Sequence, residues 1–312
     1  MKNKTSHKKS KWKNYSLSDK IFLVLTYAII IFILFVTIYP LYFTVIASIS
    51  DPYDIYRGRV FWKPSGFSLE SYKLVLQNNM IWKGYANTIY YTVLGTLFNL
   101  FLTIPAAYAL SKKRMLGRFA LTTLFLITMY FEGGMIPTYI LYRNLDLLDT
   151  RTILIICGGL SVYNVIVART YFQNNIPETL FEAARIDGAS EFRIFAQIVI
   201  PLSAPIIAVI TLFYAVGHWN DYFSALMYTL DVDLQPLQLV LRRILILNET
   251  AYEDAVNMGA SSAIIADLAK RAQQAITMKY SLVFISSAPM LILYPFIQKH
   301  FVKGIMIGSL KG

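Results

Sequence analysis

The chain has 312 residues, of which 56% are hydrophobic and only 15% charged, with a formal net charge of +11. Soluble domains contain roughly 45–50% apolar and 25% charged residues, so this composition argues against a soluble domain and indicates a membrane protein. The single cysteine excludes an internal disulfide. Lysines near the ends of apolar segments point to membrane topology and lipid headgroups rather than to nucleic acid.

Six apolar segments are each long enough to cross a hydrocarbon core of about 30 Å. The first far exceeds the apolar run of roughly 7–15 residues in a cleaved signal peptide, so we interpret it as a membrane anchor. The sequence thus predicts an all-α integral membrane protein with spans near residues 21–49, 88–111, 119–142, 152–173, 204–228 and 280–301.

Basic residues near the span ends predict the orientation. The first 20 residues hold seven lysines and one acid, the loop after the second span reads Lys112-Lys113-Arg114, and the tail carries Lys299, Lys303 and Lys311. With six spans, these regions lie on the same side, which the basic bias predicts to be cytoplasmic. We expect a basic cytoplasmic segment at 1–20, a six-span domain at 21–301 with a cytoplasmic loop at 174–203, and a cytoplasmic tail at 302–312.

Two regions are then expected outside. Residues 51–83 mix polar and aromatic residues and predict short surface helices. Residues 231–279 form a larger insert, with helix-like runs around 251–259 and 261–277. Two interpretations of the insert remain open, a surface that contacts a partner protein and a cap that packs on the spans.

The cytoplasmic loop predicts two short helices joined at a glycine. Pro177 suits the first helical position, and Gly188 suits the left-handed end of that helix. Ser190 is expected to cap the second helix, which should stop at Pro201.

The first of these helices has a face suited to docking. Glu178 and Glu182 are four residues apart and share it, and Ala183 and Ala184 keep its surface low. Apolar knobs come from Leu180, Phe181, Phe192 and Phe195. This pattern favours insertion into a groove of another protein.

The loop resembles the signature of the permease subunits of bacterial ABC importers. The resemblance is carried by Glu182-Ala183-Ala184, Gly188, Ile198 and Pro201, and its fuller form, with Asp187-Gly188-Ala189, Phe195 and Pro201-Leu202, is similar to the carbohydrate branch that includes the maltose permease subunits. Subunits that import complex oligosaccharides and polysaccharide fragments are most similar, through Gly133-Gly134-Met135-Ile136-Pro137-Thr138-Tyr139, Tyr214-Ala215-Val216-Gly217-His218-Trp219-Asn220 and Lys303-Gly304. The resemblance covers nearly the whole chain.

The resemblance implies alternating access by a heterodimer of this chain and a second permease subunit. Its partners would be two cytoplasmic ATPase subunits, which use ATP and Mg, and an extracellular sugar-binding protein, with no cofactor on this chain. The helix at 177–188 would couple the permease to an ATPase through Phe181, Glu182, Ala183, Ala184, Asp187 and Gly188, with Glu182 paired to a basic residue of the ATPase. The alternatives are a solvated Glu182 and an Asp187 that only holds the turn.

The sequence shows no catalytic equipment. It has no Gly-rich loop followed by Lys and Ser or Thr that could hold nucleotide phosphates. Its three histidines, His7, His218 and His300, are not at metal-ligand spacing. We therefore expect a transport subunit in a bacterial cell membrane, without a metal site, and not an enzyme.

Polar residues within spans are costly and indicate function. In the third span, Glu132 stands beside Tyr130, and could bond a sugar hydroxyl or pair with a basic residue of the partner permease. In the fifth, His218, Trp219, Asn220 and Asp221 follow Tyr214 by one turn, a mixture of flat rings and hydrogen-bonding groups that suits sugars. The alternative is that this cluster holds helices together while the partner subunit contacts sugar.

Two other classes of protein stay open. An ion-coupled secondary sugar transporter or channel would also show six spans, although it would not need a cytoplasmic docking element. A membrane-embedded enzyme would need convergent catalytic groups, and the cluster at 218–221 has no nucleophile. The residues neither require nor exclude an acidic saccharide.

Overall fold

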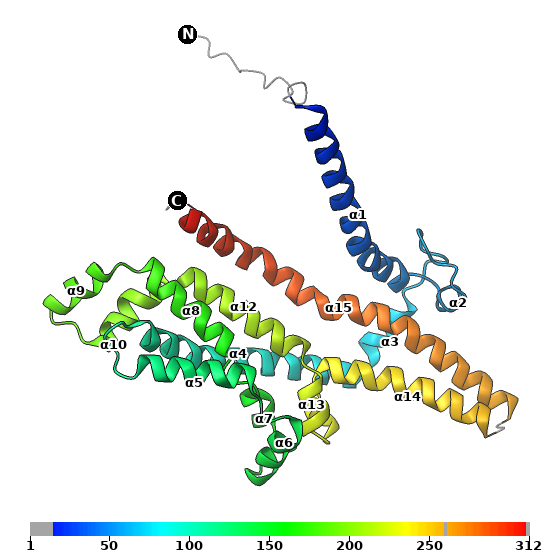
Figure 1. Ribbon diagram of the computed structural model, residues 1–312. Helices are drawn as coiled ribbons and strands as arrows, with labels where there is room; N and C mark the ends of the chain where they lie inside the picture. The colour runs from blue at the N-terminus through cyan, green and yellow to red at the C-terminus, as the bar shows by residue number, and fades with distance from the viewer. Residues whose placement is uncertain (1–14, 259–260, 310–312) are drawn as a thin grey trace.

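The computed structural model describes residues 15–258 and 261–309, and this part of the chain is helical, as predicted (Figure 1). In place of strands it has one isolated bridge, between Ser50 and Phe67. Six of the seven N-terminal lysines, and Lys311, lie outside the described residues. The helices are α1 (Leu17–Ser48), α2 (Pro52–Tyr56), α3 (Glu70–Gln77), α4 (Asn79–Ser111), α5 (Arg118–Tyr130), α6 (Met135–Asn144), α7 (Arg151–Ile156), α8 (Val162–Asn175), α9 (Glu178–Ile186), α10 (Glu191–Ile194), the π-helix η2 (Phe195–Val199), α11 (Ile200–Leu202), α12 (Ala204–Asn220), α13 (Phe223–Tyr228), the 3-10 helix η3 (Val232–Leu234), α14 (Leu237–Asn257) and α15 (Ser262–Ser309).

Three described helices, α1, α4 and α15, are long and apolar enough to cross a membrane singly. Two bent pairs also have the required length and composition: α5 with α6, at 110°, and the segment Glu191–Leu202 with α12, at 80°. The expected third, fourth and fifth spans are each interrupted, at 131–134, 157–161 and 221–222. Glycines at positive φ stand in the first two breaks, Gly134 at 87° and Gly158 at 67°, a backbone conformation that other residues rarely adopt.

The helix α4 is the centre of the bundle and packs against α7, α8, α12 and α14. Its buried surface carries a stripe of small and polar residues beside large apolar ones such as Ile81 and Ile104. Small and polar residues let helices approach closely and hydrogen-bond across the interface inside a membrane. The stripe consists of Gly84, Asn87, Thr88, Thr92, Gly95, Thr96, Asn99 and Thr103.

By contrast, α1 leans away from the bundle and contacts it at its C-terminal end (Figure 1). None of its most apolar 18-residue window is buried, so this stretch has the composition of a lipid-facing span. Three serines join its end to two other helices: the Ser281 hydroxyl of α15 lies 2.7 Å from that of Ser71, which donates to the Ser48 carbonyl at 3.0 Å.

The predicted insert 231–279 is less separate from the spans than its sequence suggests. Residues 251–257 continue α14, and residues 262–277 are the first part of α15, which runs on through the expected last span. The helices α14 and α15 pack along each other and share a core with α3 and α4 around Val75, Leu237 and Leu282.

Candidate functional site: a helix–glycine–helix element and a polar cavity

The loop at 174–203 folds as two short helices around a glycine, as the sequence predicts. Gly188 has a φ of +73°, and the Ser190 hydroxyl caps α10 by accepting from the Arg193 backbone N–H at 3.3 Å. Pro177 is one position earlier than expected: its backbone is extended and it caps α9, which begins at Glu178.

The expected stop at Pro201 is wrong. The chain passes from α10 through a π-helical turn into α11, which contains Pro201 as its second residue. The helical segment therefore continues one residue beyond Pro201, to Leu202. The sharp bend comes two residues later, at Ser203, where α12 begins.

The two sides of α9 differ in exposure. Glu182, Ala183 and Asp187 are exposed, together with Gly188. Phe181 and Ala184 are 5% and 8% exposed, so the expectation that Phe181 is a knob for a partner does not fit this structure: its ring packs inward, in the same core as Tyr108 and Phe172. Large exposed side chains flank the glycine turn, Ile186 at 87% and Phe192 at 78%.

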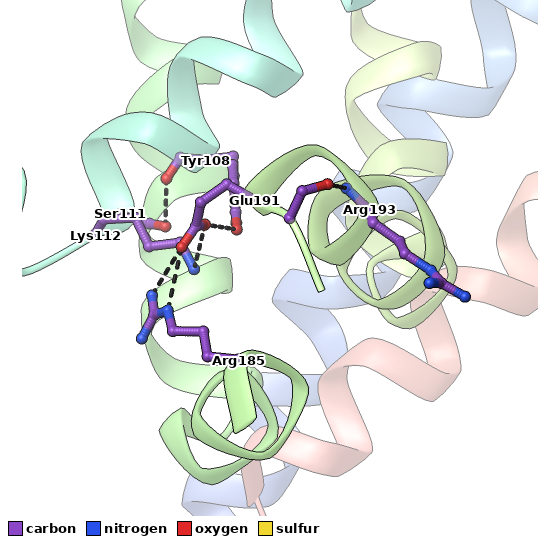
Figure 2. A network of polar contacts seen from close by, with 7 residues as sticks. Tyr108, Ser111, Lys112, Arg185, Glu191 and Arg193 are labelled. Atoms are coloured by element: carbon purple, nitrogen blue, oxygen red, sulfur yellow. Dashed lines mark hydrogen bonds and ion pairs between the residues drawn. The ribbon is translucent and has the colours of Figure 1, made fainter. Parts of the chain in front are cut away.

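A carboxylate on α10 holds both helices to the end of α4 (Figure 2). The Arg185 guanidinium donates two hydrogen bonds to Glu191 Oε1, at 3.2 Å from Nε and 3.0 Å from Nη2. The Tyr108 hydroxyl of α4 donates to the other carboxylate oxygen at 3.0 Å. The turn is therefore fixed by contacts on both of its sides.

Lys112, at the C-terminal end of α4, completes this group. Its ammonium nitrogen lies 3.3 Å from the centre of the Phe181 ring and 4.4 Å from that of Tyr108. Its distance to Glu191 Oε2 is 3.9 Å, too long for a hydrogen bond. The nitrogen is buried and has no hydrogen-bond partner in the part of the chain that the structure describes. The contact to Phe181 is therefore mainly of the cation–π type.

The pKa values of this group reflect the same surroundings. Desolvation by burial lowers the pKa of the Lys112 ammonium, and the nearby Glu191 charge opposes that shift. For Glu191, desolvation acts to raise the pKa, but the hydrogen bonds from Arg185 and Tyr108 and the charge of Lys112 outweigh it and lower the pKa below 4.5. The carboxylate is thus held in its charged form.

We call Tyr108, Lys112, Arg185 and Glu191 the clamp. Sequence reasoning missed it, because Lys112 was interpreted only as a topology signal and the other three were not singled out. The available signal was an arginine and a glutamate of opposite charge placed three residues on either side of Gly188.

A second polar group lies where α12 crosses α4. His218 Nε2 lies 2.6 Å from Asn99 Oδ1, and the Asn99 amide donates to the carbonyls of Gly158 at 3.2 Å and Gly159 at 2.8 Å. A Cβ on Gly95 would come within 2.4 Å of the His218 ring, so the imidazole occupies space that only glycine leaves open.

The remaining predicted residues of the fifth span have unequal exposure. Tyr214 and Trp219 are buried; the Tyr214 hydroxyl accepts from the Ser161 N–H at 3.0 Å, and the Trp219 N–H donates to the Ser286 carbonyl at 2.9 Å. Asn220 is exposed, and Asp221 Oδ1 accepts from the Ser224 N–H in the first turn of α13 at 3.0 Å. The first pair therefore holds helices together in this structure, while Asn220 remains available to a ligand.

A cavity of about 350 Å³ brings several of these residues together. It lies between two helix breaks, since Gly158 and Asp221 both line it with Asn99, His218 and Asn220. Tyr130 and Glu132 are not among its lining residues: Tyr130 ends α5, and Glu132 lies exposed in the break before α6 rather than inside a continuous span.

A helical membrane protein with an anchored, exposed helix–glycine–helix element and interrupted spans has the architecture of a type I transport permease. Residues 80–307 match the family described as "Binding-protein-dependent transport system inner membrane component". The chain belongs to this family, and it is a permease subunit of an ABC-type transport system.

Individual relatives support the assignment over nearly the full length. The chain is 36% identical over 296 residues to the "Polygalacturonan/rhamnogalacturonan transport system permease protein YtcP" of Bacillus subtilis (strain 168), covering 95% of this chain and 100% of that protein. It is 39% identical to "Protein LplC" of the same organism, covering 89% and 90%. The structure of a bacterial ABC transporter involved in the import of the acidic polysaccharide alginate includes a chain with 34% identity and a TM-score of 0.80, with coverage of 92% and 99%.

Proposed function

We propose that the chain forms one half of the translocation pathway of an ATP-driven, binding-protein-dependent importer of oligosaccharides. A second permease subunit would supply the other half, two cytoplasmic ATPase subunits would use ATP and Mg, and an extracellular sugar-binding protein would deliver the substrate. Support comes from relatives named for import of polygalacturonan, rhamnogalacturonan and alginate. The chain would cross the membrane six times, with both termini and α9 in the cytoplasm.

The observation that carries this proposal is the exposed side of α9. In Figure 1, α9 and α10 lie at one extreme of the bundle, at the opposite end from α2 and α14. One side of α9 is anchored by the clamp, and the other presents Glu182, Ala183 and Asp187. A short helix held rigidly in this way transmits force applied to its free side to α4, and a groove of an ATPase subunit would apply that force.

The interrupted helices support a pathway through the cavity at His218. Non-helical backbone at membrane depth is tolerated where protein buries it or where it lines water. In the break at 157–161, Asn99 donates to the Gly158 and Gly159 carbonyls. Both this break and the one at 221–222 line the cavity, through Gly158 and Asp221. We place the sugar contacts of this subunit at Asn99, His218 and Asn220. Tyr214 and Trp219 would hold the surrounding helices in place through their hydrogen bonds to Ser161 and Ser286.

The test is uptake of labelled oligosaccharides into proteoliposomes that contain the purified membrane complex. Uptake that requires both ATP and the sugar-binding protein is the expected result. Uptake driven by an ion gradient without ATP would instead support a secondary transporter and overturn the coupling role of α9. Recovery of a chemically altered saccharide would indicate an enzyme.

A further inference from the structure

We infer that a second cavity, lined by Arg242, Arg243 and Gln235, binds the carboxylate and hydroxyl groups of an acidic saccharide. This inference rests on the proposed function, which places α14 on the outer side of the membrane. The cavity has a volume of about 360 Å³ and lies between α13, the connection at 229–236 and α14. Its other lining residues are Leu226, Thr229, Leu230, Leu239 and Ile246.

The two arginines carry charge that the described part of the chain does not neutralise. Neither Arg242 nor Arg243 takes part in an ion pair there, whereas the nearby Asp233 is paired with Lys83 at 2.7 Å. On the helix, the positions three and four residues before and after each arginine carry no acid, so the usual helical partners are absent as well. Adjacent guanidinium groups without carboxylates form a site for an anion, because each presents a planar fork of donors.

A buried amide points to the same space independently. Gln235 is only 4% exposed and lines the cavity, yet its Oε1 atom has no hydrogen-bond partner among the described residues. A buried acceptor without a partner destabilises the folded protein, because the group has lost its hydrogen bonds to water. A donor that enters the cavity would satisfy it, and a sugar hydroxyl is a donor of the right size.

The rest of the lining suits a sugar ring. Leu226, Leu239 and Ile246 offer apolar surface to the C–H face of a pyranose, while the arginines would take the carboxylate of a uronate. The Arg242 guanidinium lies 5.7 Å from the centre of the Tyr222 ring. Tyr222 stands in the break next to Asp221, which lines the cavity at His218, so we infer that one chain of sugar residues contacts both cavities.

The test compares two substrates that differ only in charge. Uptake of an oligogalacturonide and of its fully methyl-esterified, neutral form is measured in proteoliposomes with ATP and the sugar-binding protein, for the original complex and for the double variant Arg242→Gln, Arg243→Gln. We expect the double variant to lose about tenfold or more in kcat/KM for the acid form and less than about twofold for the ester, because hydrogen bonds to charged groups are the stronger ones. The matched control is Lys63→Gln, Lys73→Gln, which removes two exposed positive charges from the same side and should leave the acid-to-ester ratio unchanged.

Other results have distinct meanings. Equal losses for both substrates in the double variant would overturn the inference, because they are expected if the arginines dock the sugar-binding protein or a lipid headgroup. Unchanged uptake of the acid form by the double variant would also overturn it. So would uptake of the ester alone by the original complex. If the double variant fails to assemble, the single variants and Gln235→Glu are compared by the same ratio, and Gln235→Glu should selectively weaken uptake of the acid form. Absence of ATP-dependent uptake of any saccharide by the original complex would instead contradict the proposed function.

Discussion

Arg185 and Glu191 lie on different helices, and the guanidinium of the first donates two hydrogen bonds to one carboxylate oxygen of the second. The pair closes the Gly188 turn, and the Tyr108 hydroxyl joins the same carboxylate to α4. The turn at the exposed end of the bundle is thus a rigid part of the molecule rather than a loose loop, which leads to the first prediction.

Removing the charges of this pair should weaken the clamp by a modest amount. Glu191→Gln and Arg185→Gln should each lower the thermal stability of the detergent-solubilised complex, and a double-mutant cycle should give a coupling energy of about 0.5–1 kcal/mol. The value is discounted because both side chains are partly exposed and water screens them. Arg193→Gln serves as the control, because it removes an exposed contact to Gln197, four residues later in the same helical segment. A coupling energy of zero would show that the contact between Arg185 and Glu191 does not stabilise the protein.

The same pair predicts a dependence on acidity. The folded-state pKa of Glu191 lies below its ordinary value of 4.5, so its stabilising contribution is complete above that value and is lost as the pH falls through the folded pKa. Unfolding curves of the original complex should therefore lose stability below about pH 4.5 more steeply than those of Glu191→Gln. An equal loss of stability below about pH 4.5 in the two proteins would contradict the lowered pKa of Glu191.

Glu182 should matter for transport but not for assembly. Its side chain is exposed in this structure, so Glu182→Lys should assemble in the membrane at normal amounts and lose sugar uptake. Glu178→Lys, the same charge reversal one turn earlier, should retain more uptake than Glu182→Lys. Normal uptake by the Glu182 variant would rule out its role in coupling.

The crossing of α4 and α12 offers a matched pair of glycine substitutions. In Gly95→Ala the new methyl group would lie within 2.4 Å of the His218 ring, whereas in Gly217→Ala it would meet no atom within 4 Å. Gly95→Ala should destabilise the protein by about 1–3 kcal/mol and reduce uptake, since His218 must leave Asn99. Gly217→Ala should have little effect on stability, and equal destabilisation by both substitutions would show that the close packing is not required.

The buried amide of Asn99 supports a further prediction. Asn99→Leu leaves the Gly158 and Gly159 carbonyls without their donor, at about 1–3 kcal/mol for an unsatisfied buried group. Thr103→Val removes a single hydroxyl contact to Tyr214 in the same stripe and should destabilise less. Thermal unfolding in detergent measures both, and a larger loss for the threonine variant would contradict the importance of the break.

The features that depend on neighbouring residues alone could be predicted from the sequence. Apolar length indicated the membrane class, and Gly188 and Ser190 predicted the turn and the cap in the right places. Breaks inside apolar segments escaped it, because hydropathy averages over the residues that interrupt a helix and Gly158 differs little from its neighbours on such a scale. The number of spans and the side on which the termini lie remain predictions.

The candidate site was harder to predict, because it depends on contacts between distant segments. Phe181 was expected to face a partner, but Lys112, 69 positions earlier in the numbering, draws its ring inward. Likewise, the role of Asn99 depends on its contacts with His218 and with the break at Gly158. These residues are far apart in the sequence, so no local pattern predicts the contacts. Gln235 is recognised as a candidate site residue because its buried Oε1 atom has no hydrogen-bond partner among the described residues.

The length of α15 has a mechanical consequence. Its 48 residues, at about 1.5 Å each, make a rod of roughly 72 Å, more than twice the ~30 Å of a bilayer core. Such a rod cannot shorten along its axis, so a displacement of one end is transmitted to the other. Pro289 and Pro295 lie inside α15, and each removes one backbone hydrogen bond. The helix therefore bends most easily between these two prolines.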